Sequence, residues 1–470
     1  MRSKNIYMIG IKGVGMTMLA QFLAYQGHKV SGSDISDVFL TDQVLIKSGI
    51  LIKSPFKKVN LPEKVDMVIY SSAFNEDNNV ELKQLFSFKG EKYKKTEILS
   101  YAQALGNIFN NHKGIAVCGS HGKTTVSAWL GFVLHKSGKS PNVLVGSRVP
   151  QLNGSSLCGK SKLFVAEVDE YQNKLQYFVP HGVVLNNIDF DHPDFFKTEE
   201  EYFNVFKDFV KKIPNKGFLV VNGEDEKITK LLKSCKGQVI SYGLLNENGS
   251  TRTYNYLAYD LKSKGSCQLF KVNNLGEFKI KLWGRHNILN ALAVIATARE
   301  LKLPLVKIKK YLAEFSGTAR RAEVLGEYKK ALIIDDYAHH PTEIKTTIDG
   351  IRARYPKKNL RVVFHPHTYT RTKALFSDFL NSFDLADELI ILDIYGSARE
   401  KQGGVSSLKL ARAISKNNKE KKIKQKVSNL KEIKDVSLYL KKTVLKDDLI
   451  LLMGAGDVFR VADNLLKRKK

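Results

Sequence analysis

Residues 114–125 read Gly-Ile-Ala-Val-Cys-Gly-Ser-His-Gly-Lys-Thr-Thr. The apolar run 115–118 predicts a buried strand, and the run that begins at Thr124 can open a helix. Backbone N–H groups at the start of a helix face anionic oxygens, a lysine adds positive charge, and a threonine hydroxyl can bind Mg²⁺. The stretch therefore predicts a phosphate-binding loop for ATP. The full pattern has a glycine where this chain has Val117, so a tight structural turn with a surface lysine is the alternative.

Length and composition limit the class of protein. A chain of 470 residues favours about three domains, and 43% hydrophobic residues are ample for globular folding. No run approaches ~18 consecutive apolar residues, the length of a membrane span. The first residues lead directly into an apolar strand and a glycine-rich motif rather than a secretory signal. The four cysteines form no CxxC pair and are typical of reduced thiols. We expect a cytoplasmic protein with no membrane partner.

The charge is strongly positive. Lysine and arginine number 75 against 47 acidic residues, a net charge of +28. Such an excess raises the possibility of nucleic-acid binding. The lysines are spread along the chain, and no RNA-binding or helix-turn-helix pattern accompanies them. We therefore expect no nucleic-acid partner and interpret the charge as a lysine-rich surface that attracts polyanionic substrates.

The first segment alternates strands and helices. Residues 4–9 predict a strand, residues 10–16 a glycine-rich turn and residues 17–26 a helix. The glycines are spaced GxxGxG, which only approximates the dinucleotide fingerprint, but Asp34 follows about twenty residues later. These features favour a nucleotide-type ligand over a purely structural turn.

The alternation continues through the rest of the chain. After the phosphate loop, further strands are expected in the central segment, among them an antiparallel group within 254–282, and a linker follows at 315–321. The predicted fold class is α/β with three domains. They are a Rossmann-like domain over 1–110, a central P-loop ATPase domain with a mixed or parallel sheet over 111–316, and a Rossmann-like domain over 317–470.

A magnesium site is expected near the phosphate loop. Mg²⁺ prefers oxygen ligands, which Thr124 and the strand-end Glu167 can supply. His192 follows another strand end, although nitrogen ligation of Mg²⁺ is unusual. Taken singly, Glu167 could be a surface acid and His192 could cap a turn. Their common place at the carboxyl edge of one sheet favours the functional interpretation.

Several motifs together resemble those of the Mur ligases, and the resemblance covers essentially the whole chain. In order they are Gly-Ser-His-Gly-Lys-Thr-Thr at 119–125, Glu-Val-Asp-Glu at 167–170, Asn-Ile-Asp-Phe-Asp-His at 187–192, Gly-Arg-His-Asn at 284–287 and Asp-Asp-Tyr-Ala-His-His-Pro-Thr-Glu at 335–343. Two more, His-Pro-His-Thr-Tyr-Thr-Arg-Thr at 365–372 and Gly-Ser-Ala-Arg-Glu at 396–400, resemble the branch that joins L-alanine to UDP-N-acetylmuramate.

The resemblance implies a mechanism and a set of site residues. ATP phosphorylates the substrate carboxylate, the amine of L-alanine attacks the acyl-phosphate, and phosphate leaves. ATP and Mg²⁺ are the implied cofactors, and a monomer or weak homodimer is expected. The implied catalytic residues are Lys123, His192, Glu167, Arg321 and His339, and the metal ligands Thr124, Glu167 and His192. The implied nucleotide-binding residues are Gly119, Ser120, His121, Gly122, Lys123, Thr124, Thr125, Asn287, Arg285 and Asp336. The implied substrate-binding residues are Gly13, Gly15, Ser33, Asp34, Ser71, Ser72, Tyr337, His367 and Arg371.

The chain departs from the family pattern at two places. Thr368 stands where many members carry arginine, and Tyr171-Gln172 replaces a Ser-Asp pair.

A murein-peptide recycling ligase, which adds a peptide to UDP-N-acetylmuramate, shares the motif at 335–341 and is the main alternative. A folylpolyglutamate-type ligase lacks the glycine-rich first domain, and a P-loop ATPase acting on nucleic acid would need an aromatic or arginine-rich groove. Gly317 in the linker permits unusual backbone angles, and we expect domain closure about it.

Overall fold

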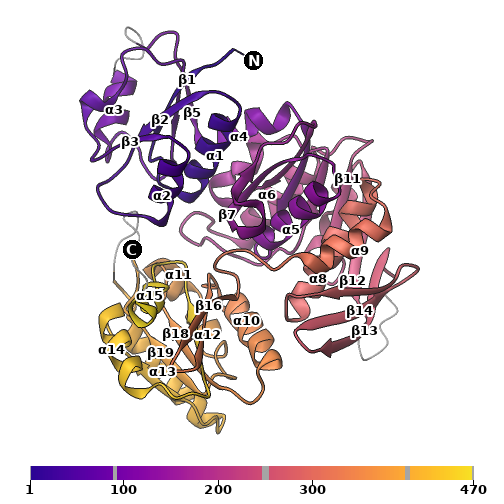
Figure 1. The fold of residues 1–470 in the computed structure, drawn as a ribbon, viewed down its shortest axis with the longest axis vertical. Coiled ribbons are helices and arrows are strands. Elements are labelled where there is room, and N and C mark those ends of the chain that lie inside the picture. The colour runs from indigo at the N-terminus through magenta and orange to yellow at the C-terminus, as the bar shows by residue number, and fades with distance from the viewer. Residues whose placement is uncertain (1, 88–92, 246–252, 397–402, 468–470) are drawn as a thin grey trace.

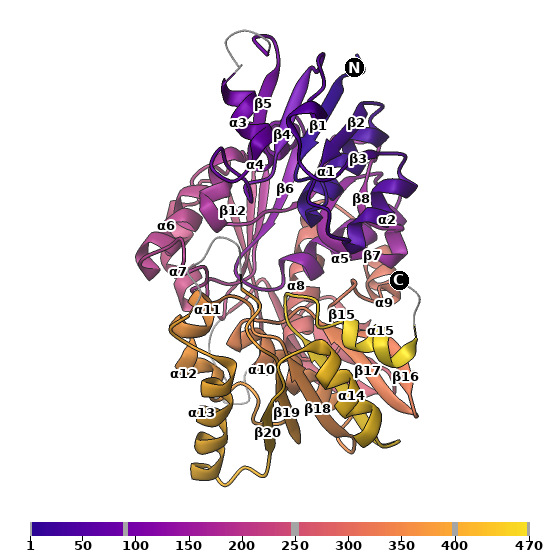
Figure 2. The same cartoon turned by 90° about the vertical axis from the view of Figure 1, so that its left-hand side faces the viewer.

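The computed structural model describes residues 2–87, 93–245, 253–396 and 403–467. Three α/β units follow one another along the chain, each built around its own sheet (Figure 1). In Figure 2 the first unit lies at the top, the central unit in the middle and the third unit at the bottom. The predicted three-domain α/β fold is confirmed, whereas the domain boundaries at 110/111 and 316/317 stay a prediction.

The first unit is a five-stranded parallel sheet in the order β3-β2-β1-β4-β5, the doubly wound arrangement expected of a Rossmann-like domain. Its strands are β1 (Asn5–Ile9), β2 (Lys29–Ser33), β3 (Leu51–Lys53), β4 (Met67–Tyr70) and β5 (Glu97–Ser100). Its helices are α1 (Val14–Tyr25), α2 (Leu40–Lys47), α3 (Val80–Ser87) and α4 (Tyr101–Asn110). The first helix begins at Val14, inside the predicted turn 10–16, because Gly13 is already its N-cap.

The central unit has a ten-stranded mixed sheet in the order β15-β14-β13-β12-β11-β10-β6-β9-β7-β8. The strands are β6 (Lys113–Cys118), β7 (Asn142–Val149), β8 (Gly154–Leu157), β9 (Leu163–Glu167), β10 (Gly182–Leu185), β11 (Phe218–Asn222), β12 (Gln238–Leu244), β13 (Tyr256–Lys264), β14 (Cys267–Val272) and β15 (Gly276–Ile280). The helices are α5 (Lys123–Lys136), α6 (Glu199–Val210), α7 (Glu226–Leu231), α8 (Arg285–Glu300) and α9 (Leu305–Glu314), with a 3₁₀ segment η3 (Tyr171–Tyr177). The middle strands are parallel, and the expected antiparallel strands form one end.

Both faces of the central sheet are covered. Apolar residues of α5, α8 and α9 form the core on one face, with Trp129 of α5 stacked on Phe315. The core on the other face joins α6 to residues of α1 and α4 from the first unit, including Phe22 and Phe109. Burial on both faces explains why strand β6 is a continuous apolar run rather than an alternating one. It also fixes the first unit against the central sheet.

The third unit is a six-stranded sheet in the order β16-β17-β21-β18-β19-β20, parallel except for the edge strand β16. Its strands are β16 (Glu323–Tyr328), β17 (Ala331–Asp336), β18 (Asn359–Phe364), β19 (Glu388–Ile391), β20 (Lys426–Asn429) and β21 (Asp448–Met453). Its helices are α10 (Pro341–Arg354), α11 (Tyr369–Ala374), α12 (Phe376–Phe379), α13 (Ser407–Glu420), α14 (Ile433–Thr443) and α15 (Arg460–Leu466). Four residues of the motif at 396–400, positions 397–400, lie outside the described residues.

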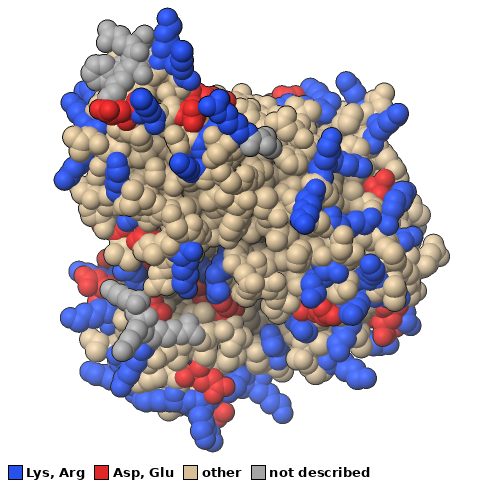
Figure 3. All heavy atoms as spheres, turned by 45° about the horizontal axis from the view of Figure 1, so that its top comes forward, with Lys and Arg blue, Asp and Glu red and all other residues tan. Residues whose placement is uncertain are grey.

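The basic side chains do not gather in one place on the face shown in Figure 3. Lysine and arginine are scattered over it with acidic side chains between them. Among the described helices, none combines the length and the apolar character that crossing a membrane requires. The linker glycine Gly317 has φ of +103°, in the left-handed region expected of a glycine turn.

The pairing of β1 with β2 depends on a close backbone approach at Gly32. A Cβ on Gly32 would lie 2.2 Å from the carbonyl oxygen of Met8, so a side chain would force the strands apart. We expect Gly32→Ala to lower the unfolding temperature by several degrees in calorimetry, because overpacking costs about 1–3 kcal/mol. Gly154→Ala is the control, since its Cβ would come no nearer than 3.9 Å to any atom. Equal unfolding temperatures for the two variants would contradict this account.

Candidate active site

The phosphate loop joins β6 to α5, as the sequence predicts. Gly122 caps α5 with φ of +79°, and Gly119 has φ of +116°, so both occupy the left-handed region that glycine favours. A Cβ on Gly119 would also lie 2.8 Å from the carbonyl oxygen of Asn187. The two glycines therefore allow the loop to pass closely over the segment after β10 before α5 begins at Lys123.

Lys123 is folded back over its own loop. Its Nζ donates to the carbonyl oxygens of Gly119 (2.5 Å) and Ser120 (3.1 Å) and pairs with Oε2 of Glu170 at 3.2 Å. Burial alone would lower the pKa of Lys123, but the neighbouring carboxylates, with Glu170 foremost, raise it above its ordinary value. Lys123 is thus a cation in a shielded position. The Glu170 carboxylate, which is 1% exposed, also accepts a hydrogen bond from Tyr202 at 3.0 Å.

The residues predicted to bind a metal fall into two adjoining groups. Thr124 donates from Oγ1 to Oε1 of Glu167 at 2.7 Å. His192 belongs with Asp169 and Glu170, whose donor atoms all lie within 4.8 Å of one another. This donor set is rich in carboxylate oxygens, as Mg²⁺ requires. The sequence analysis did not assign roles to Asp169 and Glu170, although both stand in the motif at the end of β9.

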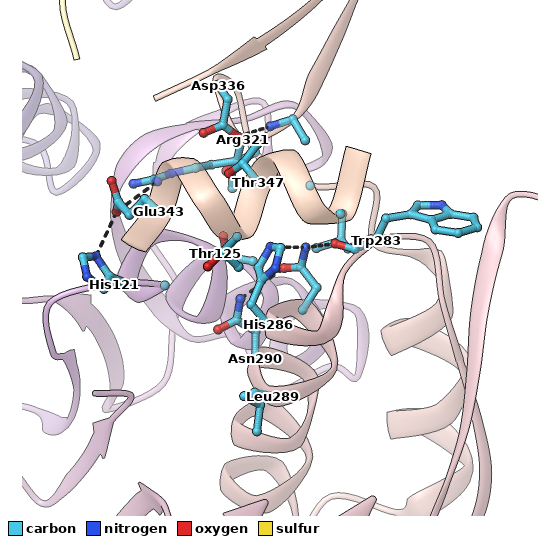
Figure 4. Close-up of a pocket in the computed structure, with 18 of the residues that line it drawn as sticks. His121, Thr125, Trp283, His286, Leu289, Asn290, Arg321, Asp336, Glu343 and Thr347 are labelled. Atoms are coloured by element: carbon cyan, nitrogen blue, oxygen red, sulfur yellow. Dashed lines mark hydrogen bonds and ion pairs between the residues drawn. The ribbon is translucent and has the colours of Figure 1, made fainter. Parts of the chain in front are cut away.

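A cavity of about 680 Å³ lies between the central unit and the third unit. Of the residues predicted to bind the nucleotide, His121, Gly122, Thr125, Asn287 and Asp336 line it, together with the predicted catalytic residue Arg321. Figure 4 shows α8, which carries His286 and Asn290, facing the third-unit side chains across this space. The cavity thus brings together residues from three separate stretches of the chain.

Several buried polar atoms that line this cavity have no hydrogen-bond partner among the described residues. They are Oδ1 of Asn186, Nδ1 of His286 and Oγ1 of Thr318. Burial, followed by the charge of Arg321, lowers the pKa of His286 to about 4, so its ring is neutral near pH 7. Because buried polar groups are normally paired, these atoms are suited to contacts with a polar ligand.

Arg285 was expected at the nucleotide, but it is not among the residues that line the cavity. Its Nη2 lies 3.1 Å from both carboxylate oxygens of Glu224. One guanidinium nitrogen therefore donates to both oxygens of an acid of its own unit. Asn287, two residues later, donates from Nδ2 to the carbonyl oxygen of Trp283 at 2.6 Å and remains at the cavity.

The third unit supplies the facing wall. Asp336 accepts hydrogen bonds from the backbone N–H groups of Ala322 (2.7 Å) and Ala338 (2.8 Å), which fixes the chain beside Arg321. The guanidinium of Arg321 lies 5.4 Å from the centre of the Tyr337 ring. These contacts hold Arg321 and Asp336 together near the end of β17, and their role toward a nucleotide stays a prediction.

The residues expected to receive an amino acid lie next to one another, but their partners differ from expectation. His339 contacts the carbonyl oxygen of Tyr337 at 3.0 Å, and its ring centre is 6.4 Å from that of His367. Burial and Arg371 lower the pKa of His339 to about 3, so it is neutral. Arg371 was expected to hold a substrate carboxylate, yet its Nε and Nη2 lie 3.1 and 3.0 Å from Oδ1 of Asp191.

The phosphate loop is joined to the third unit through His121. Its Nε2 lies 3.0 Å from Oδ2 of Asp189, and its Nδ1 lies 3.2 Å from Oε1 of Glu343. Thr342 donates from Oγ1 to Asp189 at 2.7 Å, and Arg321 lies 3.7 Å from Glu343. Figure 4 shows His121 and Arg321 converging on the same carboxylate. Both acids stand inside the motifs quoted from the sequence, but no local pattern indicated that they would meet across two units.

The residues predicted to bind the UDP-sugar gather at the carboxyl ends of strands in the first unit. Gly13 caps α1, Ser33 ends β2, and Ser71 and Ser72 follow β4; β2 and β4 are the two strands that flank β1. Asp34, expected to accept a hydrogen bond from the nucleoside, instead accepts backbone N–H groups of Lys12 (2.7 Å) and Ile35 (2.8 Å). Its carboxylate therefore holds the glycine-rich loop.

Ser33 also has an internal partner. Its Oγ donates to Oε2 of the buried Glu81 at 2.5 Å. Ser71 accepts from the N–H of Ala73 at 3.2 Å. The backbone of the glycine-rich loop, rather than Asp34 or Ser33, is thus the part of this cluster best placed for a ligand.

Comparison with known proteins shows the family of the chain. Family models match as "Mur ligase family, catalytic domain" over residues 5–113, "Mur ligase middle domain" over 117–298 and "Mur ligase, glutamate ligase domain" over 320–456. The UDP-N-acetylmuramate–L-alanine ligase of Desulfitobacterium hafniense is 37% identical over 466 residues, covering 98% of this chain and 99% of that protein. The chain belongs to the Mur ligase family. The ligase of the same name from Clostridium acetobutylicum is 38% identical over 468 residues, covering 99% and 98% of the two chains.

Solved structures of Mur ligase relatives share the fold. The UDP-N-acetylmuramate–alanine ligase of Thermotoga maritima superposes with a TM-score of 0.80 at 24% identity, covering 99% of both chains. A murein peptide ligase from Psychrobacter arcticus superposes with a TM-score of 0.73 at 23% identity, covering 99% of this chain and 98% of that one. At these identities the likeness concerns the fold.

The contact of His121 with both acids predicts a pH dependence. Burial alone would lower the pKa of His121, but the hydrogen bonds to Asp189 and Glu343 outweigh it and raise the pKa to about 9. The ordinary pKa is about 6.5. The folded state therefore binds the proton more tightly, so this stabilisation is full below pH ~6.5 and is lost as the pH rises through about 9.

We expect the unfolding temperature of the wild type to fall across this pH range more steeply than that of His121→Gln, which cannot titrate. Scanning calorimetry at several pH values from 6 to ~10 measures the unfolding temperature of each protein, which gives a profile of unfolding temperature against pH for each. Parallel profiles would show that His121 carries no proton-linked contact.

Proposed function

We propose that this protein is an ATP-dependent ligase that joins L-alanine to UDP-N-acetylmuramate through an acyl-phosphate. The observation that carries the proposal is the phosphate loop, which faces the Asp336–Glu343 segment of the third unit across one cavity. The relatives named UDP-N-acetylmuramate–L-alanine ligase, at 36–38% identity over nearly the whole chain, support this choice of substrates. The peptide-adding alternative is not favoured. We further propose that the enzyme works in the cytoplasm.

ATP would occupy the cavity with its phosphates at the loop 119–125. Loop N–H groups and Lys123 would contact the phosphate oxygens, with Lys123 exchanging its carbonyl partners for them. Asn287, Arg321 and Asp336 line the same space and would contact the rest of the nucleotide. This arrangement supplies positioning and charge neutralisation, which phosphoryl transfer needs more than covalent help.

The residues present fit Mg²⁺. Thr124, Glu167, Glu170 and His192 are the residues that would hold it. When bound, Mg²⁺ neutralises charge on the phosphate oxygens. Glu170 already holds Lys123 next to this position. The metal ligands and the lysine would therefore converge on the transferred phosphoryl group.

The amino acid would bind between His339, His367 and Arg371. His339 is neutral, so it can accept a hydrogen bond from the attacking amine. Asp191 faces Nε and Nη2 of Arg371, and we propose that Nη1 faces the carboxylate of L-alanine. With Thr368 in place of an arginine, Arg371 would be the principal cation for that carboxylate.

Activity provides the direct test. Phosphate release from ATP should require both UDP-N-acetylmuramate and an amino acid, because the acyl-phosphate forms only on the bound UDP-sugar. A panel of amino acids and UDP-sugars with a phosphate readout measures this requirement. Equal turnover with a free tripeptide in place of the amino acid, or with UDP-N-acetylmuramoyl-peptides, would refute the assignment. The panel also ranks L-alanine, L-serine and glycine, which differ by groups worth only about 1–3 kcal/mol in a pocket.

Lys123→Ala should reduce kcat by at least ~10²-fold while the protein stays folded, since it removes a charge contact that strengthens in the transition state. Lys136→Ala is the matched control because Lys136 lies exposed at the other end of α5. Steady-state kinetics and circular dichroism on both variants make the comparison. Wild-type turnover by Lys123→Ala would show that the loop is a structural turn and not a phosphate-binding loop.

A further inference from the structure

Tyr101 stands where the first unit meets the central unit. It is the first residue of α4, and α1 packs against both α4 and strands β7 and β8 of the central sheet. The ring of Tyr101 packs with the apolar cores of both units. No sequence motif singled it out, because an isolated tyrosine at a helix start has no pattern.

The hydroxyl of Tyr101 lies against the first turn of α1. A Cβ on Gly15 would come within 2.9 Å of Cζ and 3.0 Å of the hydroxyl oxygen of Tyr101. A glycine at position 15 is thus required for this close approach. The glycine-rich loop that was expected to hold the diphosphate is the same turn that Tyr101 touches.

This turn is prepared for an anion. Gly13 provides no side-chain cap, and the first turn of α1 contains no acidic residue. Thr17 N–H is bonded back to the carbonyl oxygen of Gly13, which leaves the preceding N–H groups of the helix start to other partners. The Tyr101 hydroxyl has no hydrogen-bond partner among the described residues, so it is a further donor at the same position.

The charge state of Tyr101 suits a hydrogen-bond donor. Burial, followed by the charges of Glu167 and Asp169, raises the pKa of Tyr101 above its ordinary value. The hydroxyl therefore keeps its proton and donates rather than accepts toward an anion.

We infer that Tyr101 is a substrate-binding residue, whose hydroxyl donates a hydrogen bond to the diphosphate of the nucleotide-sugar held at the first turn of α1. The inference rests on the proposed function for the nature of that substrate. Through this contact Tyr101 adds to the affinity for the nucleotide-sugar without taking part in the chemistry. The ring packs in the apolar cores, whereas the hydroxyl makes no hydrogen bond to the described residues.

The hydroxyl can therefore be removed without disturbing the fold. Tyr101→Phe keeps the ring and should leave the unfolding temperature unchanged. We expect KM for UDP-N-acetylmuramate to rise about tenfold, as the loss of a hydrogen bond to a charged group implies. The values of kcat and of KM for ATP and L-alanine should stay within about twofold of wild type, because the nucleotide triphosphate and the amino acid bind elsewhere.

Tyr93→Phe is the matched control. Tyr93 lies in the same unit, and its hydroxyl donates to the carbonyl oxygen of Pro62 at 3.2 Å. This variant should lower the unfolding temperature while KM for the UDP-sugar stays at the wild-type value. The opposite responses of the two variants separate a ligand contact from a structural one.

Calorimetric titration with UDP tests the contact without turnover. Wild type should bind UDP about tenfold more tightly than Tyr101→Phe. If wild type binds UDP with this difference but ligates no amino acid, the proposed function fails and the role of Tyr101 stands. If Tyr101→Phe binds UDP and the UDP-sugar as wild type does, or if wild type binds no UDP, the inference is overturned.

Discussion

The contact between His121 and two acids from different parts of the chain is the interaction on which the site depends. His121 belongs to the phosphate loop, Asp189 to the segment after β10 and Glu343 to α10 of the third unit. The charge on the imidazole is sustained by these acids, because burial alone would remove it. Since the cavity lies between the two units, this ion-paired histidine holds its two walls together.

Other buried charges in the site are also shared between units. Arg371 of the third unit pairs with Asp191 of the central unit, and both side chains are only 8% exposed. Burial would raise the pKa of Asp191, but Arg371 holds it well below its usual range. Separation of the units would expose these groups to water again. The free-energy cost of their desolvation therefore arises only in the assembled molecule. The same pairs that join the units thus prepare a site in which charges are shielded from solvent.

The distribution of tasks over three sheets follows from the properties of parallel strands. Loops that carry ligands lie at the carboxyl ends of such strands. The glycine-rich loop after β1, the phosphate loop after β6 and the Asp336–Glu343 segment after β17 all occupy that position. Each sheet buries its apolar strands independently, and each contributes one of these loops. Packing of α1 and α4 on the central sheet and the His121 contacts then bring the three edges toward one another.

The sequence by itself determined the elements whose signals are local. The apolar run and glycines around residues 114–125 indicated strand, turn and helix. Burial on both faces of a sheet selects apolar residues, and left-handed backbone angles select glycine. Strand β1 was predicted at residues 4–9 for the same reason. The short strands β3 and β5 were not assigned, since their partly exposed residues give little apolar signal. Motif order was enough to identify the family.

Only the tertiary structure decided the partners. Arg285 contacts Glu224 rather than the cavity, and the carboxylate of Asp34 holds its own loop. Glu170, Glu343 and Tyr101 gained their places through residues far away in the chain. The type of a charged or polar residue does not indicate which group its side chain will contact, because that group comes from another strand end or another unit. Local sequence fixes backbone conformation and burial, whereas the pairing of charges is a property of the packed units.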